Sequence, residues 1–251
     1  MSALVLSGII FVLVLGGVLL GALLRHTLPQ HHLSKESQDV VRLGVGLIAT
    51  IGALVLGLLI ASAKSSFDTQ AGQIKQITAG IILLDNLLDE YGPEALPIRK
   101  QLRGAIGPVV DRLWREKVAK SPMPFEATAA AEKVYAEIQN LTPQNDMQRS
   151  LQARAIQVSN DFAQTRLLLF VESDNQIPTP FLTILVFWLI IIFASFSLFA
   201  ELNVTTFCFL AVFALSASGA IYLILELSQP FSGLMQIPSA PLRDALAPLA
   251  S

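Results

Sequence analysis

The sequence predicts an all-α membrane protein with four transmembrane helices and a large helical-bundle insert between spans 2 and 3. Of its 251 residues, 53% are hydrophobic and only 14% are charged, whereas an ordinary soluble domain has about 25% charged residues. Four uncharged apolar runs each approach the roughly 20 residues that a bilayer span needs. No segment shows the polar–apolar alternation of a half-buried β-strand.

The apolar runs set the expected order of segments. They cover residues 3–24, 43–63, 180–200 and 203–225. The first run lacks a basic leading segment and exceeds the 7–15 residues of a secretory signal core, so we expect a retained span. The chain then divides into transmembrane helices 1 and 2 (1–63), an insert (64–179), transmembrane helices 3 and 4 (180–228) and a C-terminal tail (229–251).

Four spans place both termini and the insert on one side of the membrane. The positive-inside rule counts basic residues near span ends. Four lie on the insert side and three on the other, namely Lys64, Lys75, Arg166 and Arg243 against Arg25, Lys35 and Arg42. Together with an insert free of cysteine, this small excess predicts a multi-pass protein with the insert and both termini in the cytoplasm.

The insert shows helical periodicity throughout. Without proline between residues 43 and 91, the second span is predicted to continue as one helix of roughly 45–50 residues that Gly92 and Pro93 end. Its extension carries a heptad-like seam of Ile74, Ile77, Ile81, Leu84, Leu88 and Tyr91. This seam is expected to pack either within the insert or against identical chains, and the second arrangement predicts a homo-oligomer.

Three further helices are predicted in the insert. Apolar stripes indicate helices over about 97–117 and 125–139. The last helix is expected to begin with Thr142 as its N-cap and Pro143 at the first helical position. It should end near Ser173, ahead of Pro178.

The sequence contains little that predicts catalysis. Phosphate-loop, dinucleotide, HExxH and G-x-S-x-G motifs do not occur. His26, His31 and His32 follow no standard metal-ligand spacing. A net charge of -2 disfavours nucleic-acid binding. We therefore expect a protein that is not an enzyme and takes no cofactor or metal ion.

A stripe of small residues runs along the second span. Its members recur at spacings of three and four and are Gly46, Thr50, Ala53, Gly57, Ala61 and Lys64. Such a face lets helices approach closely, and it also suits a pore-lining helix in a narrow assembly. Lys64 would attract anions at the exit of a pore, or it could snorkel or pair with Asp68.

A second candidate region lies where the fourth span ends. Glu226 is an ionisable residue at the edge of the bilayer, and Gln229 and Ser232 follow it. Such residues are functional candidates by default, although Glu226 could also be a simple interfacial residue.

Several segments resemble a bacterial family of bestrophin-like integral membrane proteins. They are ALVLGLLIASAKSSFD at 53–68, LLDNLLDEYGPEA at 83–95, RSLQARA at 149–155, FWLIIIFASFSLFA at 187–200 and the stretch 223–246 around PFSGLM. The resemblance implies the layout of bestrophins, which are oligomeric anion channels with four spans and a large helical cytosolic region. In bestrophins the second span lines the pore. An acidic calcium-binding cluster and aromatic residues on the small face of the second span are missing here.

The resemblance and the small-residue stripe together predict the function. We expect a homo-oligomeric ion channel of the bacterial inner membrane, with a pore lined by the second span and a preference for chloride-like anions. Membrane lipid, inorganic ions and further copies of the chain are the expected partners. The alternative is a non-conducting membrane scaffold whose helical insert binds a partner.

Overall fold

The computed structural model describes residues 2–29, 34–115, 125–173, 179–200, 203–231, 233–240 and 243. In these residues every regular element is a helix, and four helices are long and apolar enough to cross a membrane. The predicted all-α, four-span class is therefore confirmed. The chain forms two compact units. We call residues 1–67 with 176–229 the spanning unit, and residues 68–175 with 230–251 the extramembrane unit.

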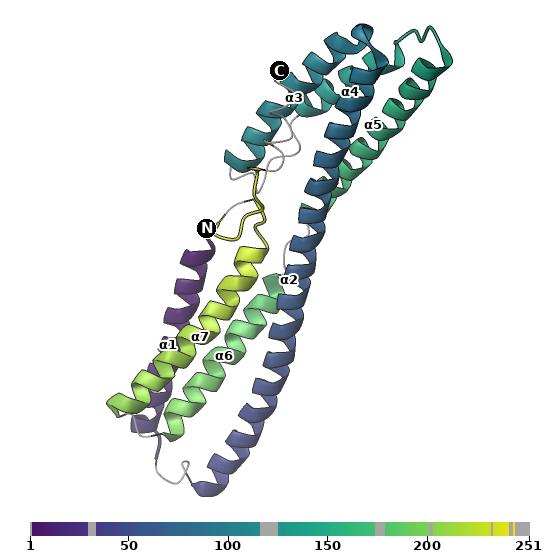
Figure 1. Ribbon diagram of the computed structural model, residues 1–251. Helices are drawn as coiled ribbons and strands as arrows, with labels where there is room; N and C mark the ends of the chain where they lie inside the picture. The colour runs from purple at the N-terminus through teal and green to yellow at the C-terminus, as the bar shows by residue number, and fades with distance from the viewer. Residues whose placement is uncertain are drawn as a thin grey trace. The chain divides into compact units, whose positions relative to one another are not determined.

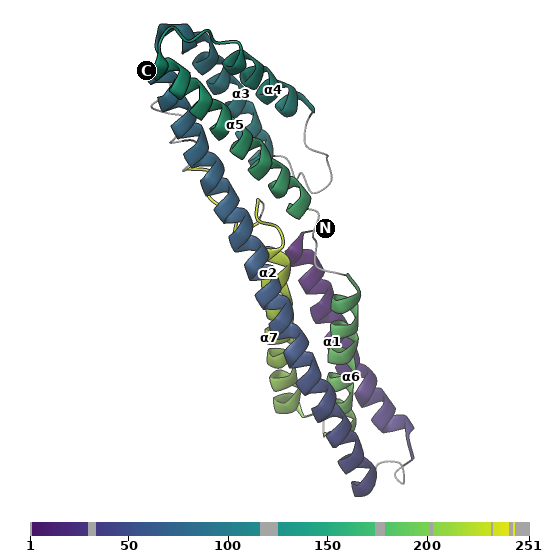
Figure 2. The same ribbon diagram turned by 90° about the vertical axis from the view of Figure 1, so that its right-hand side faces the viewer.

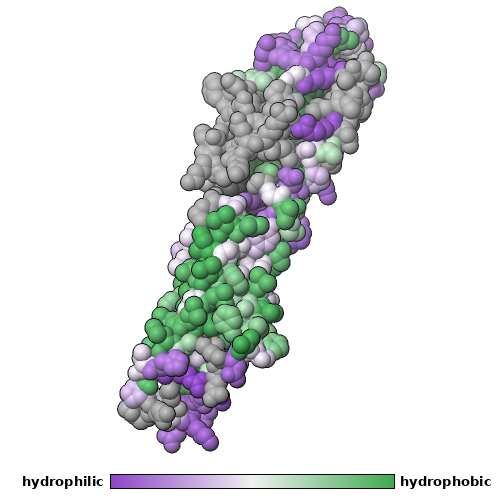
Figure 3. Space-filling view, turned by 90° about the vertical axis from the view of Figure 1, so that its left-hand side faces the viewer, coloured by the Kyte–Doolittle hydropathy of each residue, from purple (hydrophilic) through white to green (hydrophobic). Residues whose placement is uncertain are grey.

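The spanning unit contains α1 (Ala3–Thr27), α6 (Thr179–Phe199), α7 (Val204–Leu227) and the first part of α2 (Lys35–Tyr91). In two views α1 lies alongside α6 and α7 (Figures 1 and 2). On the face in Figure 3, hydrophobic residues cover the spanning helices, as expected for surfaces that contact lipid.

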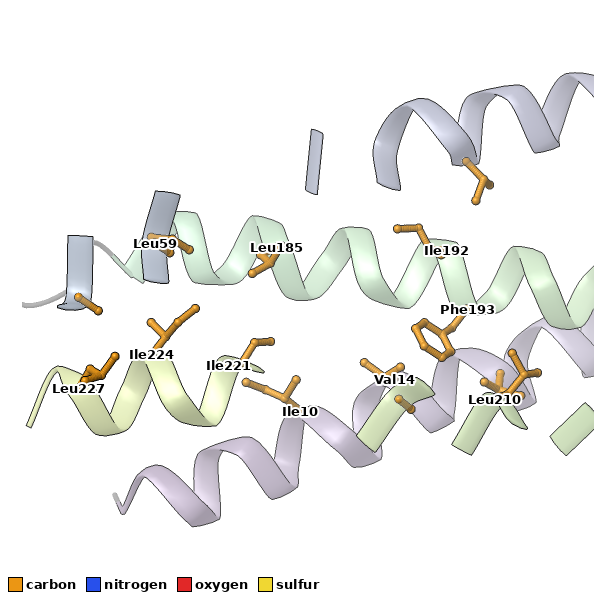
Figure 4. Packing of buried hydrophobic residues seen from close by; sticks show 14 residues of the cluster. Ile10, Val14, Leu59, Leu185, Ile192, Phe193, Leu210, Ile221, Ile224 and Leu227 are labelled. Atoms are coloured by element: carbon orange, nitrogen blue, oxygen red, sulfur yellow. The ribbon is translucent and has the colours of Figure 1, made fainter. Parts of the chain in front are cut away.

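Side chains from all four helices form the core of this unit. Figure 4 shows Ile10 and Val14 of α1 near residues of α6 and α7, with Leu59 contributed by α2. Val14, Ile221 and Ile224 are completely buried. The core is therefore built from large apolar side chains at the helix crossings.

Two glycines bring α1 against the backbone of α6. A Cβ atom added to Gly17 would lie 2.9 Å from the carbonyl oxygen of Ile190, and one added to Gly21 would overlap the carbonyl of Ala194. Gly17 and Gly21 form the G-x-x-x-G pattern that permits close helix contact in membranes. Any larger side chain at Gly21 would push the two helices apart.

Polar groups meet the carbonyl end of α6. The guanidinium of Arg25 donates a hydrogen bond to the carbonyl of Ala200, and the side-chain amide of Gln38 donates to that of Phe199 at 3.5 Å. The last carbonyls of a helix have no partner within the helix, and a positive charge there is favourable.

Helix α2 is longer than the sequence predicted. It has 57 residues and begins at Lys35, eight residues before the expected start of the span. The Ser34 hydroxyl accepts a hydrogen bond from the backbone N–H of Ser37, and Glu36 lies in the first turn. A serine cap and an acidic first turn both favour a helix start here. The connection from α1 is correspondingly shorter than predicted.

The extramembrane unit contains the rest of α2, a short 3-10 turn (Pro93–Ala95), α3 (Leu96–Arg115), α4 (Phe125–Gln139) and α5 (Asp146–Ser173). Gly92, at φ +122°, ends α2 as predicted. The expected seam is buried throughout, at Ile74, Ile77, Ile81, Leu84, Leu88 and Tyr91. These side chains form core within the chain, so the seam is not an exposed surface and gives no support to the predicted homo-oligomer.

The predicted start of α5 is wrong. The helix begins at Asp146, and the Asn145 side chain accepts a hydrogen bond from the backbone N–H of Gln148 at 2.8 Å. Asparagine is at least as good an N-cap as threonine. Thr142 and Pro143 therefore belong to the preceding turn.

A group of charged side chains joins α2 to α3. Asp85 is 2% exposed, and its two carboxylate oxygens accept hydrogen bonds from Arg99 at 3.1 and 2.8 Å. Arg103 approaches the same carboxylate at 3.7 Å, and Asp89 pairs with Arg99 from the exposed side. The hydrogen bond from Asp85 is the largest effect that raises the pKa of Arg99, and burial partly opposes it. A buried carboxylate is stable here because two arginines compensate it.

Candidate functional site

The small-residue stripe lies on one open face of α2. All six of its members are exposed: Gly46, Thr50, Ala53, Gly57, Ala61 and Lys64. The opposite face of the helix contains Val45, Leu59 and Ala63, which are buried in the spanning unit. Because the large residues of α2 pack against its own chain, the small residues are left pointing outward.

Open space surrounds the glycines of this stripe. A Cβ atom added to Gly46 or Gly57 would meet nothing within 4 Å. The stripe therefore does not serve close packing within the chain, which was one of its two interpretations. What approaches it lies outside this chain, either another copy or the contents of a passage.

The polar capacity of the stripe is small. The Thr50 hydroxyl donates a hydrogen bond to the carbonyl of Gly46 at 2.9 Å, so its proton is not offered to a passing ion. Lys64 is the single charged member, and its Nζ atom lies 5.6 Å from the ring centroid of Phe67. This arrangement is favourable for a cation over an aromatic face, and it holds the positive charge beside the stripe.

The second candidate region does not share this open surface. Glu226 is 3% exposed, and its side chain is hydrogen-bonded to Tyr222, one turn earlier on α7. The backbone N–H of Gln229 donates to the Glu226 carbonyl at 3.0 Å and continues the end of the helix. Ser232 lies outside the described residues. The structure thus places Glu226 in the interior and leaves the α2 stripe exposed.

Two groups of structural importance were missed at the level of sequence. The Gly17–Gly21 crossing had a readable signal, the spacing of four in an apolar run. The Asp85–Arg99 pair had none, because its partners are 14 residues apart and on different helices. No group of three or more potential metal ligands occurs in the part of the chain that the structure describes.

Comparison with known proteins identifies the fold. The model of the bestrophin-like domain matches residues 12–242. Among solved structures, a variant of a bacterial bestrophin homolog from Klebsiella pneumoniae is similar over 99% of this chain and 97% of that chain, with 14% identity and a TM-score of 0.70. A second variant of that homolog matches over 94% and 97%, with 15% identity and a TM-score of 0.65. A search of curated proteins finds no match.

The family match covers almost the whole chain and agrees with the resemblance seen in the sequence. At 14–15% identity the structural similarity shows the fold alone. That fold has the same four apolar helices and helical insert that the sequence predicts. The chain belongs to the bestrophin-like family.

Proposed function

We propose that the protein is an oligomeric, anion-preferring ion channel in which α2 of each copy faces a shared pore. The observation that carries the proposal is the exposed stripe of Gly46, Thr50, Ala53, Gly57, Ala61 and Lys64, which has no covering element in its own chain. Bestrophins are oligomeric anion channels, so membership of the bestrophin-like family supports the same function.

A channel requires more than one copy. The stripe is the face of a single helix and cannot enclose a passage by itself. Several copies with their small faces toward one axis would form a narrow pore, because residues such as Gly57 keep the helix surface close to the backbone. Identical chains around an axis form a closed cyclic assembly.

The stripe also suggests how such a pore would work. Glycine and alanine give its wall no hydrogen-bonding side chain, and the Thr50 proton is bonded to its own helix. A constriction of this kind gates by dewetting. Preference for anions would then come from Lys64, whose charge would be repeated once per copy at the pore mouth.

We further propose that the protein lies in the cell inner membrane with the insert and both termini in the cytoplasm. This places Lys64 at the cytoplasmic mouth, where the second span leaves the bilayer. The support is the small excess of basic residues near the span ends on the insert side.

Cysteine accessibility tests whether the stripe faces water. In a Cys208→Ser background, which removes the single native cysteine, Thr50→Cys and Ala61→Cys are compared with Leu54→Cys and Leu58→Cys. All four positions are exposed in one chain, but only the first two belong to the stripe. A small water-soluble methanethiosulfonate should modify the stripe cysteines in membranes and leave the leucine-derived cysteines unmodified. Equal protection of all four contradicts a pore at this face.

Planar bilayers test conduction and the role of Lys64. The parent should carry current, and Lys64→Glu should shift the reversal potential toward cation preference. Lys133→Glu makes the same charge change at an exposed position on α4 and should leave selectivity unchanged. Silence from an intact oligomer would favour the non-conducting scaffold. Current with unaltered selectivity in Lys64→Glu would remove this residue from the mouth.

A further inference from the structure

An apolar groove lies between α2, α6 and α7 within the spanning unit. Its volume is about 290 Å³. Small residues form the walls contributed by α2 and α7, including Gly52, Ala53 and Ala217, while Trp188 and Phe196 of α6 supply large aromatic surfaces. Ala53 and Phe196 are exposed, so the groove opens to the surroundings of the unit.

The groove lies at the depth of the hydrocarbon core. Its lining on α6 extends from Leu185 to Phe196, and these positions fall well inside the span Thr179–Phe199. At 1.5 Å per residue this lining covers about 16 Å along the helix axis. The groove is therefore long, and it runs in the direction in which lipid chains lie in a bilayer.

Water and ions are poor occupants of this groove. None of its lining residues has a charge or a hydroxyl group. Water in a cavity needs two to four polar partners, and apolar cavities of similar character remain dry. The occupant must instead be apolar.

The width of the groove separates a lipid chain from a helix of another copy. A volume of 290 Å³ spread over about 16 Å corresponds to a channel about 5 Å across, whereas a helix is about 10 Å in diameter. Carbon atoms in contact lie about 3.5–4.0 Å apart, so a single hydrocarbon chain is about 4 Å thick and fits.

We propose that this groove binds an acyl chain of a phospholipid from the surrounding bilayer. The chain lies along α6 and contacts the face of the Trp188 ring and the small residues of α2 and α7. Burial of the chain follows from shape and packing, because lipid outside the groove is as apolar as the groove itself. The proposal is independent of ion conduction.

Trp188 is a reporter placed in the groove by the sequence itself. The other tryptophan is Trp114, and Trp114→Phe leaves Trp188 as the single tryptophan. This protein is reconstituted into phosphatidylcholine vesicles with and without bromine atoms in the middle of the acyl chains. Brominated chains in contact with the ring should quench its fluorescence.

A matched pair of variants separates groove lipid from lipid around the protein. Ala217→Phe fills the groove, and Val212→Phe adds a ring to an exposed position on the same helix outside it. Quenching should fall by about half in Ala217→Phe, because the chain loses its carbon contacts, and should stay at the parent value in Val212→Phe. Ala217→Leu serves if the larger side chain prevents folding, as judged by gel filtration.

Two results would overturn the proposal. Equal quenching in the parent and in the folded groove-filling variant would mean that only surrounding lipid reaches Trp188. Absence of quenching in the parent would mean that protein covers the groove, as an interface with a second copy would. Neither result depends on whether the protein conducts ions, so a failed channel proposal leaves this test intact.

Discussion

Helices α1 and α2 carry glycines at similar spacings, yet these glycines have opposite environments. On α1, Gly17 and Gly21 lie against the backbone of α6, where there is no room for a side chain. On α2, Gly46 and Gly57 face open space. The comparison teaches that small-residue spacing defines a flat helix face but does not identify what meets it.

The reason lies in the other faces of the two helices. Helix α2 buries large residues such as Leu59 against its own chain, so its small face points outward. Helix α1 is turned the other way. Its glycines face α6, and large residues such as Leu20 and Leu23 are exposed. Each helix therefore makes its closest contact through the face that its neighbours leave available.

The sharpest break in the comparison is Gly21→Leu. Its side chain would overlap the carbonyl of Ala194, and overpacking against backbone cannot relax by a rotamer change. We expect no folded protein after purification, measured by gel filtration. Gly16→Leu is the matched control, because a Cβ atom there meets nothing within 4 Å. Loss of folding in both variants would assign the effect to helix α1 in general.

Gly57→Leu tests the open glycines. It should leave folding intact, since a Cβ atom at Gly57 meets nothing within 4 Å. In a channel it should narrow the pore and reduce single-channel conductance by about tenfold or more. Gly44→Leu adds the same side chain to an equally open position outside the stripe and should conduct like the parent. Equal conductance in the two variants contradicts pore lining by Gly57.

Asp85→Asn extends the comparison to the other end of α2, where charge rather than glycine fixes the helix. It leaves Arg99 and Arg103 without their shared buried carboxylate. We expect a loss of about 2 kcal/mol in the free energy of unfolding, below the value for fully buried pairs because both arginines are partly exposed. Asp146→Asn breaks an exposed pair with Arg149 and should leave the unfolding midpoint unchanged.

Gly52→Ala provides an intermediate case. A Cβ atom at Gly52 would make ordinary contacts with Trp188 at 3.7 Å and Leu185 at 4.0 Å. Replacement of a helical glycine by alanine should stabilise the fold by about 0.5–1 kcal/mol. Gly17→Ala should have the opposite sign because its Cβ would press on the Ile190 carbonyl. Thermal unfolding in one detergent measures both, and equal signs would contradict the described packing.

Tyr91→Phe has the smallest expected effect and concerns the extramembrane end of α2. The buried Tyr91 hydroxyl has no hydrogen-bond partner among the described residues, so its removal should change stability by less than about 1 kcal/mol at neutral pH. Burial, followed by the charge of Glu94, raises the pKa of Tyr91.

The raised pKa gives this variant a pH signature. The contribution of Tyr91 to stability is complete below the ordinary tyrosine pKa and is lost as the pH rises through the higher folded pKa. Unfolding midpoints measured at increasing alkaline pH should therefore fall less steeply for Tyr91→Phe than for the parent. Identical slopes would mean that Tyr91 does not titrate in the folded protein.

The sequence by itself determined the class of the molecule. Apolar runs of bilayer length predicted four spans, and helical periodicity with Gly92 and Pro93 predicted where α2 ends. The bounds of α4 agree with its stripe as well. These features are local, since length, hydropathy and turn chemistry act on neighbouring residues.

Other features depended on which faces meet in space. The seam from Ile74 to Tyr91 and the stripe from Gly46 to Lys64 have similar spacings along one helix, but the first is buried and the second is exposed. Periodicity places residues on a common face, and only packing decides what covers it. The same holds for Asp85 and Arg99, whose pairing across 14 residues requires α2 and α3 to be folded against each other.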